Sequence, residues 1–98
     1  MAQFDIFLSR TGDHLVDVQS GLLDHFDTRL VVPLLDPAKA ATPIARLNPS
    51  FPVDGRPMVL YPQFALAVPV SELTRRIGSL EEHHFTIMSA IDMLISGY

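Results

Sequence analysis

The chain has 98 residues, of which 48% are hydrophobic, with a formal net charge of -4 and no cysteine. This length predicts one domain over residues 1–98, and a domain so small buries only about 60–70% of the surface that its unfolded chain exposes. The acidic balance disfavours nucleic-acid binding, which needs clustered cations, and the lack of cysteine excludes disulfides and thiolate zinc sites. We expect the surplus of apolar surface to be covered by another chain.

Neither a membrane nor a cofactor is expected from the sequence. No apolar run reaches the ~18 residues of a membrane span, and the start MAQFDIFLSR lacks a basic region followed by a long apolar run. Glycines occur singly, so no loop that cradles phosphate is predicted. We therefore expect a cytoplasmic protein without a cofactor.

The N-terminal third predicts antiparallel strands. Apolar and polar residues alternate over residues 3–9 and again over 15–20, with a glycine-containing turn at 10–14, which is typical of a β-hairpin. Residues 29–35 are a continuous apolar strand. Because Pro33 lacks a backbone donor, this strand is expected at a bulge or at a sheet edge.

The middle of the chain is less regular. Residues 36–52 are rich in proline and alanine without a clear period, and we predict an irregular segment with at most one short edge strand. Asp54 and Gly55 then stand between two short apolar runs, which is a strong hairpin signal. Residues 64–70 alternate again. The chain up to this point therefore reads as antiparallel β-structure.

The period becomes helical after Arg76, and we interpret Arg75-Arg76 as a solvated turn. Ser79 and Glu82 fit a capping box, in which the serine oxygen takes the N3 amide and the glutamate reaches back to the cap amide. A helix is predicted from there to the chain end. Its apolar positions recur at helical spacing: Leu80, His84, Met88, Ile91 and Ile95. The predicted fold is mainly β with one C-terminal helix, an antiparallel β-barrel.

Two polar groups are candidates for chemical sites. His83 and His84 point about 100° apart on a helix, so they do not suit one metal ion, and we interpret them as a solvated pair. A second group could supply a nucleophile, a base and an orienting residue. It comprises Ser20, Asp24, His25, Asp27 and Arg29. Because no glycines frame the serine as in a nucleophile elbow, a loop is the favoured interpretation.

The end of the predicted helix carries unfavourable charges. Asp92 and the terminal carboxylate lie near the negative end of the helix dipole, where cations are preferred, and no Lys or Arg follows Arg76. Two interpretations stay open. In the first, solvent screens the charges, so that they cost the helix little free energy. In the second, a basic group of a partner completes an uncapped end, and Ile95 and Tyr98 cover its stem.

Four segments carry a resemblance to a known family. They are VDVQSGLLD from Val16, RLVVPLL from Arg29, LAVPVSEL from Leu66 and AIDMLISGY from Ala90. In order and spacing the chain resembles the CcdB family, the toxin halves of bacterial toxin–antitoxin pairs, from about Gln3 to the end. The resemblance implies an SH3-like antiparallel β-barrel of the CcdB/MazF-like plasmid toxin fold, and a homodimer paired through the sheet.

The resemblance also implies a non-enzymatic poison of DNA gyrase. Such a protein would bind the gyrase A subunit and trap the complex with cleaved DNA. A cognate CcdA-like antitoxin would neutralise it and form a repressor with it, so that DNA is contacted only through that complex. Carried over by position, the gyrase-binding residues are Leu22, Leu23, His84, Phe85, Met88, Asp92, Ile95, Ser96, Gly97 and Tyr98.

One departure from the family pattern leaves alternatives open. Ser96 stands where the best-known pattern has a tryptophan that stacks on an arginine, a contact worth ~0.5–2 kcal/mol. One alternative is therefore a non-toxic homologue that only binds antitoxin. Another is an endoribonuclease of the MazF/Kid type, which shares the barrel; Arg29, His25 and Asp27 would then supply the acid–base chemistry. The acidic net charge argues against that second alternative.

Overall fold

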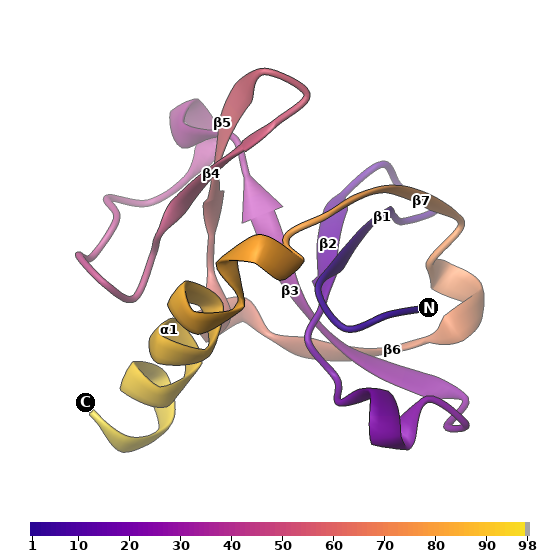
Figure 1. Cartoon of the computed structure of the whole chain (residues 1–98). Coiled ribbons are helices and arrows are strands. Elements are labelled where there is room, and N and C mark those ends of the chain that lie inside the picture. Colours follow the sequence, from indigo (N-terminus) through magenta and orange to yellow (C-terminus); the bar gives the residue numbers. More distant parts are fainter. Residues whose placement is uncertain (98) are drawn as a thin grey trace.

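The computed structural model describes residues 1–97, which form a curled antiparallel sheet with one helix at its C-terminal end (Figure 1). The strands are β1 (Asp5–Leu8), β2 (His14–Asp17), β3 (Thr28–Leu35), β4 (Ser50–Val53), β5 (Arg56–Leu60), β6 (Leu66–Pro69) and β7 (Arg75–Ser79). The helix α1 spans His84–Ser96. Single 3-10 turns are η1 (Gly21–Leu23), η2 (Pro37–Lys39), η3 (Pro62–Phe64), η4 (Val70–Glu72) and η5 (Glu81–His83). The predicted fold class is confirmed.

The strand order is β4-β5-β3-β2-β1-β7, and β6 pairs with β3 outside this path. Both predicted hairpins are present. In the second hairpin Asp54 and Gly55 have φ angles of 52° and 78°, which are the left-handed values that a two-residue turn between twisted strands requires. None of the helices within residues 1–97 is long and apolar enough to cross a membrane.

Pro33 lies in a central strand, so the expectation of an edge is wrong. On one side β3 pairs with β2; on the other, residues 28–31 pair with β6 and residues 34–35 with β5. The Pro33 carbonyl accepts a hydrogen bond from the Tyr61 amide, so the backbone of Pro33 faces this second side. The missing donor therefore falls between the end of β5 at Leu60 and the start of β6 at Leu66, where it interrupts no ladder.

Residues 75–79 are a strand, not the predicted turn. β7 pairs with β1, and the Arg76 guanidinium lies 3.1 Å from the Asp5 carboxylate. An exposed edge strand can be short and charged. Such a strand lacks the apolar alternation from which strands are predicted. The prediction of a solvated Arg75-Arg76 turn is therefore wrong.

The predicted start of the helix is also wrong in detail. Ser79 Oγ accepts from the Glu81 amide, not from Glu82, and η5 separates this residue from α1. The Leu80 amide donates to the Phe4 carbonyl, and the Leu80 side chain is buried in the core. These contacts extend the sheet by one residue, so the α-helix itself begins only at His84.

The irregular segment 36–52 is held by one buried amide. The Asn48 Nδ2 donates to the Leu60 carbonyl at 3.0 Å and to Gln63 Oε1 at 2.9 Å, and its Oδ1 accepts from the Ile44 amide. Only η2 and the start of the edge strand β4 are regular here, which confirms the prediction for this segment. The segment is thus ordered by side-chain bonds in place of a ladder.

The sheet packs on both faces. The larger core lies between the sheet and α1 and includes Ile6, Val16, Leu34, Phe51 and Ile87. The smaller core on the opposite face comprises Phe7, Leu15, Val31, Val68 and Leu73. Successive strand residues point to opposite faces, so the alternation in the sequence supplies both cores.

Candidate partner-binding surface

Helix α1 buries one side and exposes an apolar stripe on the other. Ile87 and Ala90 are fully buried against the sheet. The opposite side presents residues at helical spacing, which we call the helix patch: Phe85, Met88, Asp92 and Ile95. Phe85 is 80% exposed and Ile95 is 78% exposed. Met88 and Ile95 share the helical spacing of the buried Leu80, but they lie outside the core.

The end of the helix is capped, which corrects the expected uncapped terminus. Gly97 adopts a φ of 81°, and its amide donates to the Met93 carbonyl at 2.9 Å. A glycine has no Cβ penalty at this left-handed angle. The Ser96 hydroxyl donates to the Asp92 carbonyl at 2.8 Å. Tyr98, which belongs to the predicted site, lies outside the described residues.

The carboxylate of Asp92 is exposed at this end of α1. Within residues 1–97 the ion pairs join Asp17 with Arg29 and Asp5 with Arg76, and Glu82 Oε1 lies 3.5 Å from His83 Nε2. Arg46 reaches α1 one turn earlier, where its Nε donates to Ser89 Oγ at 2.9 Å. No cation of the described residues is therefore paired with Asp92, and a partner's cation can approach it.

The two histidines at the helix start are half-buried against aromatic rings, so they are not a solvated pair. The His83 ring centroid lies 4.9 Å from that of Phe51, and the His84 centroid lies 6.3 Å from Phe4 and 4.1 Å from Phe85. His84 Nδ1 is 3.0 Å from the Glu81 carbonyl. Of this predicted part of the site, Phe85 is the side chain that projects into solvent.

Leu22 and Leu23 project from the turn η1 and form what we call the loop patch. Leu22 is 88% exposed. Gln19 links the turn to β3. Its Nε2 donates to the Leu23 carbonyl at 2.9 Å, and its Oε1 accepts from the Leu30 amide at 3.0 Å. Ser20 Oγ accepts from the Leu22 amide. The loop patch is thus apolar at its surface and fixed by hydrogen bonds at its base.

A buried ion pair anchors the base of that loop. Arg29 Nε and Nη2 both donate to Asp17 Oδ2, at 2.9 and 2.6 Å, and the two side chains are 1% and 0% exposed. Asp17 Oδ1 accepts from the Gln19 amide. The sequence pattern makes Arg29 the first residue of a strand and also groups it with the polar residues around His25, and it does not reveal this pair. Arg29 belongs to the core of the sheet and is separated from the exposed His25 and Asp27.

The predicted site residues do not form one continuous surface in a single chain. The end of α1 and the turn η1 lie well apart in Figure 1. The predicted site residues therefore fall into two separate surfaces. One is the helix patch, with Ser96 and Gly97 at its end, and the other is the loop patch.

Comparison with solved structures shows that the fold is the MazF-like one. An "Endoribonuclease from Mycobacterial species" superposes with a TM-score of 0.79 at 11% identity, over 97% of this chain and 90% of that chain. The Mycobacterium tuberculosis toxin MazF-mt6 superposes with a TM-score of 0.75 at 16% identity, over 93% and 95%. At these identities the likeness concerns the fold alone. A search of curated proteins found no match.

The family is defined by sequence. A model of the family described as "CcdB protein" matches residues 3–97, nearly the whole chain. The chain belongs to the CcdB family of toxin–antitoxin toxins, and an antitoxin partner follows from that membership.

Proposed function

We propose that this protein acts in the cytoplasm by binding the A subunit of DNA gyrase and trapping the gyrase–cleaved DNA complex, and that a cognate CcdA-like antitoxin neutralises it. The observation that carries the proposal is the helix patch. It joins exposed apolar side chains to a carboxylate that no cation of residues 1–97 neutralises. An exposed apolar stripe of this kind is typical of a protein–protein interface and does not stabilise a monomer.

An arginine of gyrase is the partner group that this chemistry favours. Its guanidinium would donate to the Asp92 carboxylate, and charge-assisted bonds of this kind are short and strong. Ile95 lies one turn further on, where it can cover the apolar stem of the arginine. In a homodimer two helix patches would be presented together, and one symmetric partner could engage both.

The endoribonuclease alternative is disfavoured by the position of Arg29. An arginine that stabilises charge on a scissile phosphate must present its guanidinium to the substrate. Here that group is buried and occupied by Asp17. The likeness to MazF-type structures therefore supports a common fold, and the net charge of -4 gives RNA little attraction.

The test is a DNA supercoiling and cleavage assay with bacterial gyrase. We expect gyrase-linked cleaved DNA with the wild-type chain and its loss in Asp92→Lys and in a chain that lacks residues 96–98. Glu82→Lys is the matched control, because it reverses a charge just before α1 but outside the helix patch, and it should retain activity.

Three results would contradict the proposal. The first is cleavage that persists unchanged in Asp92→Lys and in the truncated chain. The second is defined cleavage of RNA by the purified protein, with or without EDTA, which would make it a nuclease. The third is normal growth of cells that express the wild-type chain at high level without antitoxin, which would favour the non-toxic homologue.

A further inference from the structure

Arg46 brings positive charge to the side of α1 that carries the helix patch. Its Nε donates to Ser89 Oγ at 2.9 Å, and among the Lys and Arg residues of the described chain Arg46 is the one that forms a side-chain hydrogen bond with α1. Residues three and four apart share a helix face, and Ser89 lies four residues after Phe85 and three before Asp92. The guanidinium of Arg46 therefore borders the helix patch.

Most of this guanidinium is free to bind a partner. Arg46 is exposed, and within residues 1–97 its two Nη groups take part in no hydrogen bond or ion pair. These groups carry the remaining N–H donors of the side chain, and a guanidinium can bind a carboxylate through two parallel hydrogen bonds. The guanidinium groups of Arg29 and Arg76, by contrast, are each paired with a carboxylate of this chain.

The backbone holds Arg46 in a conformation that arginine disfavours. Its φ of 71° lies in the left-handed region, where the Cβ of most residues is crowded and where glycine and asparagine are the common occupants. The amide of the buried Asn48 donates to the Ile44 carbonyl at 2.9 Å, and its Oδ1 accepts from the Ile44 amide, so the turn around Arg46 is closed. Such strain persists where the surrounding structure enforces it, and it is common at binding sites.

The Arg46 side chain is therefore oriented before a partner arrives. The turn closed by Asn48 fixes its backbone, and Ser89 fixes one edge of its guanidinium. A flexible surface arginine loses rotamer freedom when it is bound, whereas little of that freedom remains here. A cation at Ser89 and an anion at Asp92 thus stand about one turn apart along α1.

We propose that Arg46 is a specificity-determining residue of the partner-binding surface, and that it binds a carboxylate of the gyrase A subunit while Asp92 binds an arginine of the same subunit. The inference rests on the proposed function for the identity of the partner. A partner turned the other way would bring like charges together at both positions, which costs free energy. The pair Arg46 and Asp92 therefore sets the orientation in which gyrase is engaged.

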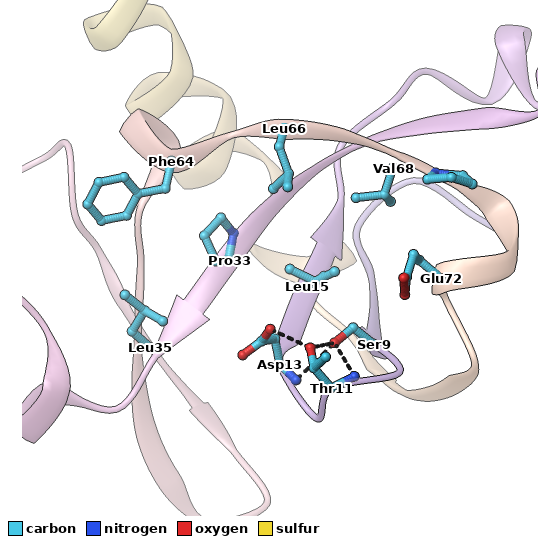
Figure 2. Close-up of a pocket in the computed structure, with 11 residues that line it drawn as sticks. Ser9, Thr11, Asp13, Leu15, Pro33, Leu35, Phe64, Leu66, Val68 and Glu72 are labelled. Carbon is cyan, nitrogen blue, oxygen red and sulfur yellow. Dashed lines mark hydrogen bonds between the residues drawn. The ribbon is translucent and has the colours of Figure 1, made fainter.

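A groove on the face of the sheet that carries the smaller core does not offer this chemistry. It has a volume of about 530 Å³ and lies over β2, β3 and β6, with Asp13 and Glu72 at one end (Figure 2). None of the described residues that line it is a lysine, arginine or histidine. An acidic group of a partner is therefore repelled by this groove and attracted to Arg46.

The test measures the binding of the purified gyrase A subunit to the full chain by isothermal titration calorimetry at two salt concentrations. We expect Arg46→Asn to weaken binding about tenfold and to reduce its dependence on salt, because an ion pair is lost. Ser89→Ala should weaken it about threefold, since the guanidinium then loses its orientation. Arg10→Asn is the matched control. This arginine is also exposed and donates one hydrogen bond through Nε, to the Ser71 carbonyl, and the Arg10→Asn chain should bind as the wild type does.

A stability measurement distinguishes this role from a structural one. Asparagine tolerates the φ of 71° better than arginine, so Arg46→Asn should leave the midpoint of urea unfolding unchanged or raise it. Weaker binding together with a lowered midpoint would show that Arg46 supports the fold, and it would overturn the proposal. Equal affinity of Arg46→Asn and the wild type would overturn it too, as would equal losses in Arg46→Asn and Arg10→Asn.

The failure of this inference differs in its results from the failure of the proposed function. If Asp92→Lys loses binding while Arg46→Asn retains it, only the inference about Arg46 fails. If the wild-type chain binds gyrase A and the variants show the expected losses, but no cleaved DNA is trapped, only the proposed function fails. A wild-type chain that does not bind gyrase A would overturn both.

Discussion

Arg29 and Asp17 illustrate what a single pair of residues contributes to the fold. Their register across β2 and β3 is diagonal, so both side chains point to the same face. The pair was missed from the sequence because twelve residues separate the two positions, and a charged residue near a polar loop reads as part of that loop. Only the register of the hairpin, which the sequence does not state, makes them neighbours.

Removing one member of the pair should be costly. We predict that Arg29→Met lowers the free energy of unfolding by about 3–5 kcal/mol, because it leaves the Asp17 carboxylate buried without its cation. Urea denaturation at one fixed protein concentration measures this. The double variant Asp17→Leu with Arg29→Met should recover at least half of the loss, and a double variant as unstable as the single one would contradict the desolvation argument.

At the scale of elements, the strongly patterned segments were predictable and the edge segments were not. The two hairpins and the existence of a C-terminal helix follow from alternation, the Asp54-Gly55 turn and the helical period. β7 and the late start of α1 were missed because they depend on pairing with β1 and on the bond from Leu80 to Phe4. The helical spacing of Leu80, Met88 and Ile95 predicted an apolar helix but did not show which of these residues would be exposed. The groove over β2, β3 and β6 was not predicted, since its lining comes from three strands and the turns beside them.

The stability of α1 gives a test of why Asp92 is present. An anion near the C-terminal end of a helix is unfavourable, so Asp92→Lys should raise the free energy of unfolding by about 0.3–1 kcal/mol at low salt. Thermal or urea unfolding with and without added salt measures it, and screening should reduce the gain. Glu82→Lys, near the opposite end, should be destabilising by comparison.

A variant that gains stability while it loses activity would show that Asp92 serves a partner and not the fold. If Asp92→Lys instead destabilised the isolated chain, the carboxylate would have a structural role, and its proposed contact with gyrase would lose its main support.

Taken as a whole, the molecule exposes more apolar surface than its size requires. The exposed large side chains include those of both patches and also Phe26, Leu30, Ile44, Phe64 and Leu66. A monomeric protein of this size rarely exposes so many large apolar side chains. This fits the expectation from composition that another chain covers part of the surface.

We predict that the purified protein forms a homodimer whose dissociation is visible by sedimentation velocity on dilution. Replacing Phe26 and Leu30 by serine should weaken the dimer about tenfold or more, because both are large apolar side chains exposed in β3 or just before it. Ile44→Ser, an equally exposed change in the 36–52 segment, is the matched control. A wild-type chain that stays monomeric at every concentration would refute the prediction.

The outer strands of the sheet restrict the ways in which copies can join. β4 contains Pro52, β6 contains Pro69, and β7 begins with Arg75 and Arg76. A proline has no main-chain N–H to donate, and an arginine places charge at the sheet edge. Both features hinder the pairing of a strand from another molecule with that edge. Molecules of this protein without a bound partner should therefore stay dispersed in solution instead of forming fibrils.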